Sequence, residues 1–501
     1  MVGDRGLLRW TAALLPATIA LAASALYLLF ATGGLLTVVP PTSGVAALLG
    51  ESFARGRLDL LLDPPPQLAV LENPYNPESR AGIDASTDAS YYRGRYYVYW
   101  GPAPAVAAGI WRLLFQRSLG DAAIALLAAV ASLLFSLLLI VRLWRHKYPG
   151  LPAWLAAVGV AAVALANPIL WNLKFPAVYE AAVGAGQAFL LGGLYFAVST
   201  LGGRESGLAN PNPEWRAMVV VGGLWGLAVA SRLTLLLGVG VLLAGTLVGL
   251  GGFANGYVPV RPRIAASVGL LLPIVVIGGL LGLYNGLRFG NPTETGLQYQ
   301  LVPDFDSTRL AAEGEIFAAG YFAPNILNYA IAPMHFTSEF PFLMPIRGGV
   351  IGRGDWLRVE ALPRAYTVED VTGVVLASPF VLFSVILAGM WVWPKVGAAL
   401  GGGIRRQGPR AAEPSGGVVV GFILVAAAIA AAAPTLAYRH AANRFELDYI
   451  PLLMIASTLG AWEAYRRSGS SPRTRRIASF VIVASAAWTA LAGILLGAGR
   501  T

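Results

Sequence analysis

The sequence predicts an all-α polytopic membrane protein with about eleven transmembrane helices. Of its 501 residues, 56% are hydrophobic and 12% are charged, whereas an ordinary soluble domain is about 25% charged. Long apolar runs alternate with short polar segments, which is typical of repeated bilayer crossings. The chain contains no cysteine, which excludes disulfides, thiolate metal sites and a cysteine nucleophile. The net charge of +10 is scattered between the apolar runs, which argues against a nucleic-acid-binding face.

The individual crossings are predicted from apolar runs of about 20 residues. The stretch 217–252 is too long for one helix, and Arg232 in its middle indicates a tight helical hairpin that turns there. The first run lacks a small-residue cleavage site, so we expect a retained helix rather than a signal peptide. The predicted crossings are 11–31, 121–141, 151–170, 179–199, 217–231, 233–252, 264–285, 372–393, 417–436, 450–465 and 477–497.

The basic residues predict the orientation in the membrane. With the N-terminus in the cytoplasm, 18 Arg and Lys residues but only five acidic residues lie on the inner side. Three short inner loops are strongly basic: Arg142–Lys147, Arg405–Arg410 and Arg466–Arg476. The positive-inside rule requires this. We therefore expect a multi-pass protein of the cytoplasmic (inner) membrane whose large loops face the external side.

Two external connections are much longer than a helical bundle needs. Residues 32–120 and 286–371 carry most of the acidic residues of the chain. Structureless connections of this length are uncommon unless they are functional, so we expect a substrate site there rather than two solvated caps. Within the first connection, apolar residues at three- and four-residue spacing over 43–62 predict a helix lying along the membrane interface.

An aromatic segment, 91–100, stands near the end of the first connection. It holds five tyrosines and a tryptophan and follows two carboxylates, Asp84 and Asp88. Its alternation allows a short hairpin turned by Arg93-Gly-Arg95, and crowded aromatics are also typical of the belt at a membrane interface. The functional alternative is a wall for a sugar ring or an isoprenoid chain, for which the candidates are Tyr97, Tyr99 and Trp100. A carboxylate beside lipid is costly unless it is solvated or employed, which favours a role for Asp88.

The second connection begins with a turn-rich exit from the seventh crossing, whose charges are Arg288 and Glu294. We interpret both as substrate-binding candidates. Four arginines follow later in this connection: Arg347, Arg353, Arg358 and Arg364. The two parallel N–H groups of a guanidinium suit the binding of phosphate. The pair Asp304 and Asp306 matches a metal-binding spacing, but about one such pair is expected by chance in this chain, so no metal site is predicted.

A third external patch joins the ninth and tenth crossings. There Arg439, His440 and Arg444 precede two carboxylates, Glu446 and Asp448. One interpretation is an ion pair between Arg444 and Asp448, four residues apart on one helical face. The other is that Arg439 and Arg444 hold a lipid-linked phosphate at the headgroup boundary.

Three segments of the chain are similar to those of a known group of membrane enzymes. The segments begin at Asp88 (DASYYRGRYYVYWGPAP), at Tyr284 (YNGLRFGNPTETG) and at Arg444 (RFELDYIP). Together with one helix, a long acidic external loop and a multi-spanning bundle, they resemble the GT-C glycosyltransferases, especially bacterial proteins related to protein mannosyltransferases. The resemblance implies a single GT-C-like membrane domain over 1–501, with 32–120 as the catalytic loop.

The resemblance also implies a reaction, the transfer of a sugar from a polyprenyl-phosphate donor to an acceptor on the external side. A carboxylate of the first connection would serve as general base. On a helical turn Asp84 and Asp88 would share a face, and the repulsion between them would raise the pKa of one of the two carboxyl groups. Glu51, nearer the first crossing, is the rival base. The donor phosphate would be met by Arg444 and Arg439 with His440, without a metal. A non-catalytic transporter or flippase for a lipid-linked glycan is the alternative, although no mid-helix ionisable residue suggests ion coupling.

Overall fold

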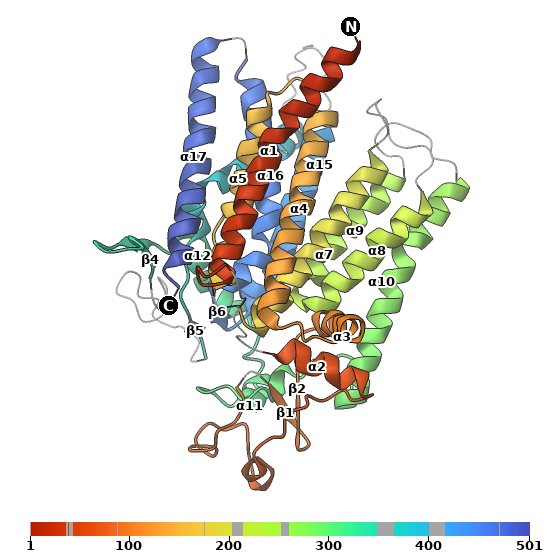
Figure 1. Ribbon diagram of the computed structural model, residues 1–501, viewed down its shortest axis with the longest axis vertical. Helices are drawn as coiled ribbons and strands as arrows, with labels where there is room; N and C mark the ends of the chain where they lie inside the picture. The colour runs from red at the N-terminus through yellow and green to blue at the C-terminus, as the bar shows by residue number, and fades with distance from the viewer. Residues whose placement is uncertain are drawn as a thin grey trace.

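The computed structural model is a bundle of helices with irregular segments gathered at one end (Figure 1). We call this the loop end, because the first and second long connections both lie there. The residues described are 2–36, 39, 44–87, 89–174, 176–202, 214–251, 260–346, 348, 365–399, 416–469 and 471–500. The four arginines Arg347, Arg353, Arg358 and Arg364 lie outside them.

A helix occupies each of the eleven apolar ranges predicted from the sequence. The helices are α1 (Val2–Ala31), α4 (Asp121–Lys147), α5 (Ala153–Leu165), α7 (Val178–Leu201), α8 (Trp215–Ser231), α9 (Leu236–Leu250), α10 (Val260–Phe289), α14 (Leu382–Ala399), α15 (Gly416–Ala437), α16 (Ile450–Arg467) and α17 (Pro472–Ala498).

Within the described part of the chain, seven helices are long and apolar enough to cross a membrane: α1, α4, α7, α9, α10, α15 and α17. The protein is therefore a multi-pass membrane protein, while the number of eleven crossings stays a prediction.

Large aromatic side chains fix the packing of the bundle. Trp225 of α8 is fully buried and donates from Nε1 to the Leu190 carbonyl of α7 at 3.2 Å. Trp462 of α16 donates in the same way to the Leu155 carbonyl of α5 at 3.2 Å. A buried indole needs such a partner, because an unpaired N–H in an apolar interior is costly. The two indoles thus hold α7 to α8 and α5 to α16.

The predicted turn at Arg232 is confirmed, but the tight hairpin is not. Helix α8 ends at Ser231, and a 3₁₀ turn, η2 (Leu233–Leu235), leads into α9. The two helices pack on different neighbours, α8 on α7 and α10 and α9 on α15. The guanidinium of Arg232 is held by the buried Asp448, at 3.2 Å from Nε to Oδ1.

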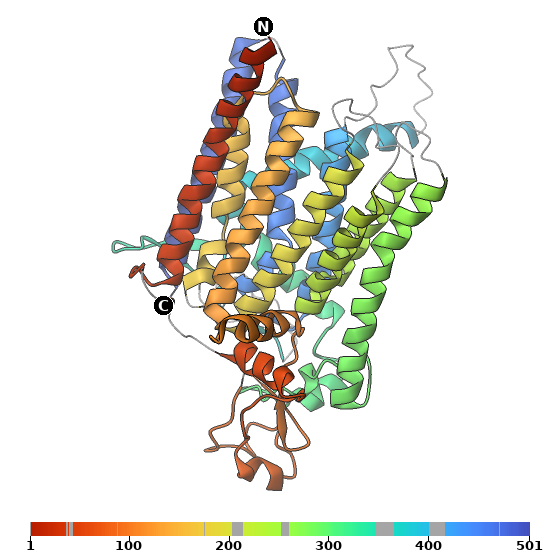
Figure 2. The ribbon, with the colours of Figure 1, turned by 45° about the vertical axis from the view of Figure 1, so that its right-hand side comes forward.

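Two short helices of the first connection lie across the loop end, α2 (Val45–Ala54) and α3 (Ala103–Phe115) (Figures 1 and 2). The carboxylate of Asp121, the first residue of α4, accepts hydrogen bonds from the first two amides of α2 at 3.1 and 3.0 Å. This contact anchors α2 on the bundle. The predicted interfacial helix over 43–62 is therefore shorter than expected, and it is accompanied by a second one.

Helix α3 begins within the sequence Gly-Pro-Ala-Pro at 101–104. Proline is tolerated in the first helical turn, where its missing N–H leaves no bond unmade, and α3 begins at Ala103. Gly101 before it packs against α8, where an added Cβ would lie 1.9 Å from the Ala230 carbonyl oxygen. This sequence therefore docks the first connection on the bundle and starts a helix.

The remaining elements are short and lie at the loop end. The first connection has η1 (Pro66–Val70) and an antiparallel pair, β1 (Ser90–Tyr92) and β2 (Arg95–Tyr97). Between α5 and α7 lies α6 (Ile169–Lys174). The second connection and the segment after α15 contain η3 (Leu297–Tyr299), α11 (Ser307–Ala312), η4 (Ala319–Tyr321), α12 (Phe322–Ile331), β3 (Met334–Phe336), β4 (Leu343–Pro345), β5 (Thr367–Val368), α13 (Val374–Ala377), η5 (Pro379–Val381), β6 (His440–Ala441) and η6 (Asn443–Asp448).

Candidate active site

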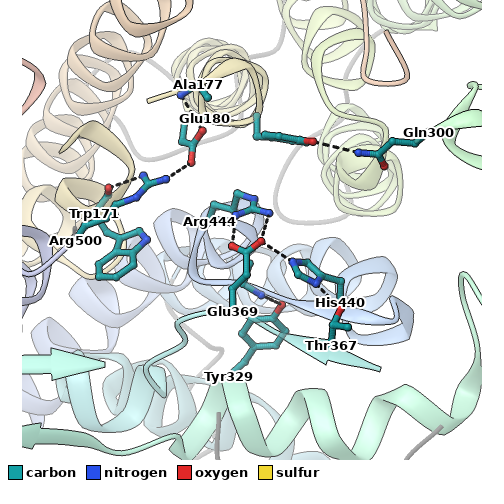
Figure 3. A network of polar contacts seen from close by, with 12 residues as sticks. Trp171, Ala177, Glu180, Gln300, Tyr329, Thr367, Glu369, His440, Arg444 and Arg500 are labelled. Atoms are coloured by element: carbon teal, nitrogen blue, oxygen red, sulfur yellow. Dashed lines mark hydrogen bonds and ion pairs between the residues drawn. The ribbon is translucent and has the colours of Figure 1, made fainter. Parts of the chain in front are cut away.

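The pairing of β5 with β6 brings the second connection beside the third external patch. The two strands are parallel, with Thr367 opposite His440, although some 70 residues separate them in the chain. The Glu369 amide continues the pairing by donating to the Ala441 carbonyl at 2.8 Å. As a result the Glu369 carboxylate faces both His440 and Arg444 (Figure 3).

Arg444 is held by Glu369 rather than by the predicted partner. Its Nη2 donates to Glu369 Oε1 at 2.9 Å, and Nη1 contacts the other carboxylate oxygen. The predicted ion pair with Asp448 is wrong, because the segment forms a 3₁₀ helix and Asp448 pairs with Arg232 and Thr234 instead. The guanidinium also lies 5.1 Å from the ring centre of Tyr179 of α7, while Arg444 Nε has no hydrogen-bond partner within the described part of the chain.

Burial, charge and hydrogen bonding determine the protonation states of Glu369 and His440. Burial opposes the charge of Glu369, but the hydrogen bond from His440 and the charge of Arg444 outweigh it, so its pKa lies well below the ordinary value. Burial lowers the pKa of His440 against the opposing effect of Glu369, and Arg444 and Arg439 lower it further. A neutral His440 then donates from Nε2 to Glu369 at 2.9 Å and accepts at Nδ1 from the Thr367 hydroxyl at 2.7 Å.

A second ion pair lies beside the first. Arg500 Nη2 donates to Glu180 Oε1 at 2.8 Å, and Arg500 Nη1 donates to the Trp171 carbonyl at 2.9 Å (Figure 3). The other carboxylate oxygen of Glu180 accepts from the Ala177 amide at 3.0 Å, which caps the start of α7. We call the six residues at this junction the mouth cluster: Tyr179, Glu180, Glu369, His440, Arg444 and Arg500.

The hairpin predicted in the first connection is confirmed. Strands β1 and β2 pair antiparallel around Arg93 and Gly94, both of which have positive φ, as a two-residue hairpin turn requires. The aromatic wall proposed from the sequence is divided, however. Tyr99 and Trp100 contact Tyr179 of the mouth cluster, with ring centres 6.3 and 5.0 Å away.

Tyr97 instead packs edge-on against Phe289 of α10 at 5.3 Å, away from the mouth cluster. It belongs to the packing of the hairpin on α10, together with Arg288. Of the three aromatic candidates, the structure thus brings only Tyr99 and Trp100 to the charged residues.

Asp88 lies outside the described residues, but the residues around it are tied to the same place. Gln300 of the second connection donates from Nε2 to the Thr87 carbonyl at 3.1 Å and forms a bridge with Ser90. The same amide group lies 3.2 Å from the Tyr179 hydroxyl. The segment on both sides of Asp88 is therefore linked through Gln300 to the mouth cluster.

The other two carboxylate candidates are placed differently. Asp84 is exposed on a non-helical segment, so the helical face that it was expected to share with Asp88 does not form over 83–87. Glu51 of α2 is held in ion pairs with Arg55 and with Arg112 of α3, the latter at 3.4 Å. Glu51 therefore links α2 to α3, and neither carboxylate contacts the mouth cluster.

Two further candidates have structural contacts. Glu294 accepts from the Gly296 amide at 2.6 Å and from the Gln298 side chain, which closes the turn after α10. Arg439 lies 5.1 Å from the ring centre of Phe305 and donates to the Ala365 carbonyl at 3.4 Å. Arg439 thus holds the second connection, beside the mouth cluster.

Arg288 is buried, and its contacts connect α10 to the first connection. Its Nη1 donates to the Val98 carbonyl at 2.5 Å and its Nη2 to Asn285 Oδ1 at 2.7 Å, while the guanidinium lies 3.8 Å from the Tyr284 ring centre. These contacts leave little of Arg288 for a substrate. Arg288 therefore positions the hairpin, and its role in substrate binding stays a prediction.

Replacing Arg288 by methionine is expected to lower the stability of the protein by about 3 kcal/mol, since hydrogen bonds to charged groups contribute about 1.5–3 kcal/mol each. Thermal unfolding in detergent measures the effect, with the exposed Arg117→Met as control. An unchanged unfolding temperature accompanied by weaker binding of polyprenyl phosphate would return Arg288 to the substrate site.

Metal binding is not suggested by the side chains of the described residues. No group of three or more His, Asp or Glu residues in this part of the chain is arranged to hold a metal ion. Asp306, one of the pair at metal-binding spacing, caps α11 by accepting from the amides of Thr308 and Arg309 at 3.1 Å each. The spacing of that pair thus reflects a helix start.

Four members of the mouth cluster were not found from the sequence: Tyr179, Glu180, Glu369 and Arg500. Tyr179 and Glu180 stand at the boundary of a predicted crossing, where a tyrosine and a carboxylate are ordinary. Glu369 is one of ten acidic residues in the second connection. The only signal was the carboxylate at the start of an apolar run, which sequence analysis treats as a helix boundary.

Known proteins resemble this chain in structure but do not match it in sequence. No family model matches the sequence, and no curated protein matches it. The structure is similar to that of the Archaeoglobus fulgidus oligosaccharyltransferase, with a TM-score of 0.51 and 12% identity over 97% of this chain and 56% of that chain. It also aligns with ArnT from Cupriavidus metallidurans bound to undecaprenyl phosphate, with a TM-score of 0.40 and 13% identity over 97% and 76% of the two chains. The chain spans about half the length of the oligosaccharyltransferase, and at 12% identity the likeness concerns the fold alone, in agreement with the GT-C-like fold expected from the sequence.

Proposed function

We propose, from a GT-C-type fold whose loop end carries the mouth cluster, that this protein transfers a sugar from a polyprenyl-phosphate-linked donor to an acceptor. The observation that supports this most is Arg444, a guanidinium at the loop end that lies 5.1 Å from the ring centres of Tyr179 and Phe445 and whose Nε has no hydrogen-bond partner among the described residues. We infer that a lipid-linked phosphate would meet the protein at this end of the bundle. We infer that the loop end faces the external side.

The proposed reaction is an inverting displacement. The acceptor hydroxyl oxygen forms a bond to the anomeric carbon of the donor while the bond from that carbon to the phosphate oxygen breaks. A carboxylate of the first connection takes the hydroxyl proton, and we assign this role to Asp88. Polyprenyl phosphate leaves with the electron pair of the broken bond, and Arg444 stabilises its charge.

Binding of the phosphate requires Arg444 to exchange one anion for another. Both terminal nitrogens of Arg444 are bound to Glu369, whose side chain is 46% exposed, whereas that of Arg444 is 15% exposed. Of the two partners, Glu369 is thus the one that can turn toward solvent while Arg444 stays in place. We infer that the donor phosphate displaces the Glu369 carboxylate, with His440 and Arg439 close to the same position.

The reaction is tested with purified protein in lipid nanodiscs and polyprenyl-phosphate sugars. Release of polyprenyl phosphate, with the sugar on an acceptor or on water, is the expected result. The transporter alternative predicts movement of the lipid-linked sugar across vesicles without cleavage of the sugar–phosphate bond. That outcome would overturn the proposed transfer.

Replacing Glu369 by glutamine is expected to tighten the binding of polyprenyl phosphate about fivefold, equivalent to about 1 kcal/mol for a half-exposed ion pair. Glutamine has the same shape and can still accept from His440, but it no longer competes as an anion. Titration in nanodiscs measures the dissociation constant. Glu313→Gln, which removes the exposed partner of Arg309, is the control and should leave binding unchanged. Weaker binding in Glu369→Gln would instead make Glu369 a residue that positions Arg444.

A further inference from the structure

A narrow cavity runs inside the bundle, beginning at Glu180 and leading away from the loop end. One face of α7 lines it, with Glu180, Gly184, Gln187 and Leu191 at three- and four-residue spacing. The facing side of α4 contributes Ala125–Ser136, and α6 contributes Asn172. From Glu180 to Leu191 the chain advances eleven residues, about 16 Å at the helical rise of 1.5 Å per residue. The cavity therefore reaches into the part of the bundle that faces the membrane interior.

Residues whose polar atoms have no hydrogen-bond partner in the described part of the chain line this cavity. Gln187 is 2% exposed, and neither its Oε1 nor its Nε2 has a partner among the described residues. The same holds for Ser132 Oγ of α4 and Asn172 Oδ1 of α6. Leaving a buried polar group unpaired costs about 1–3 kcal/mol. Three side chains from three helices, all lining one cavity, thus require a ligand that donates and accepts hydrogen bonds.

The size of the cavity decides which ligand this is. Its volume is about 50 Å³, whereas a cavity that admits benzene measures about 150 Å³. A sugar ring is larger still and is excluded. An alkyl or isoprenoid chain would leave the amide of Gln187 unpaired. A water molecule needs about 10–15 Å³ of such space and several polar partners, so the cavity has room for about three to five.

We propose that this cavity binds a short file of water molecules, held by Gln187, Ser132 and Asn172 and ending at Glu180. Each oxygen of Glu180 already accepts one hydrogen bond, from Arg500 and from Ala177. A carboxylate has about four acceptor positions, so water from the cavity can complete its shell. The file thus hydrates the Glu180–Arg500 ion pair of the mouth cluster from inside the bundle.

Hydroxyl-radical footprinting by X-ray radiolysis tests the file, because radicals formed from bound water modify the side chains next to it. In the intact protein in nanodiscs, Leu133 and Leu191 line the cavity, whereas the equally buried Leu139 and Leu190 do not. Modification of Leu133 and Leu191 several-fold above that of Leu139 and Leu190 is expected. Equal, low modification of all four leucines would overturn the proposal.

Gln187→Met supplies a second measurement, since methionine has nearly the same size and no hydrogen-bonding amide. If water pairs the amide, the substitution reduces the modification of Leu133 and Leu191 and does not raise the unfolding temperature. If the cavity is dry, removing an unpaired amide raises the unfolding temperature and leaves the modification unchanged. A lipid chain that copurifies with the protein and is lost in Leu191→Trp would also contradict the water file.

Discussion

Replacing Arg444 by alanine is expected to weaken the binding of polyprenyl phosphate by about 10- to 100-fold. A charge-assisted hydrogen bond contributes about 1.5–3 kcal/mol, and about 1.4 kcal/mol corresponds to a tenfold change. The guanidinium offers a phosphate two terminal nitrogens once Glu369 has moved, and its unpaired Nε adds a third donor. Titration of the variant with polyprenyl phosphate in nanodiscs measures the loss.

The effect should be one of binding and not of folding. Removing a partner from a buried ion pair is strongly destabilising when the other charge stays buried, but the Glu369 side chain is 46% exposed and can be solvated. The unfolding temperature of Arg444→Ala should therefore remain close to that of the unchanged protein. Arg309→Ala, which breaks an exposed pair on α11, is the matched control. A large fall in unfolding temperature with normal binding would show that the ion pair with Glu369 is the whole role of Arg444.

The features predicted correctly from the sequence depend on local signals. Apolar runs mark the helices, since burial in lipid requires long uninterrupted segments. The two-residue turn at Arg93 and Gly94 was read from a glycine between alternating aromatics, and this signal needs no knowledge of the fold. A helix break at Arg232 follows equally from a single charge in an apolar run.

The features that sequence analysis missed depend on pairing between distant segments. The partner of Arg444 is Glu369, 75 residues earlier, and the parallel pairing of β5 with β6 selects it. A two-residue strand has no sequence signal of its own. The ion pair with Asp448 was expected because four-residue spacing fits an α-helix, whereas η6 is a 3₁₀ helix, in which that spacing does not place two side chains on one face.

Charged residues beside aromatic ones were the least reliable sign of a substrate site. Arg288 and Tyr97 stand in such segments, yet both pack the hairpin against α10. An arginine beside aromatic rings can serve two purposes at a membrane boundary, structural packing or substrate binding. In both, the guanidinium donates hydrogen bonds from its edge and lies against a ring with its face. Only the contacts of each side chain distinguish the two purposes, and they place Tyr99 and Trp100 against Tyr179 of the mouth cluster.

Replacing Asp88 by asparagine is expected to reduce the rate of sugar transfer by about 10²–10⁴-fold with donor binding retained, the usual loss when a general base is removed. Thr87 and Ser90 are both tied to Gln300, whose side-chain amide lies 3.2 Å from the Tyr179 hydroxyl. The ring of Tyr179 in turn lies 5.1 Å from the guanidinium of Arg444. The described residues before and after Asp88 are therefore tied to Tyr179, which lies beside the guanidinium that we assign to the donor phosphate. Release of polyprenyl phosphate in nanodiscs measures the rate.

The two other carboxylates of the first connection are the controls for Asp88, and their contacts predict different outcomes. Asp84→Asn alters an exposed side chain on an irregular segment and should leave both rate and stability unchanged. Glu51→Gln removes the ion pairs that join α2 to α3 and should lower the unfolding temperature more than the rate. A normal rate in Asp88→Asn with an inactive but stable Glu51→Gln would move the base to Glu51. Normal rates in all three variants would overturn the proposal that Asp88, Asp84 or Glu51 is the base.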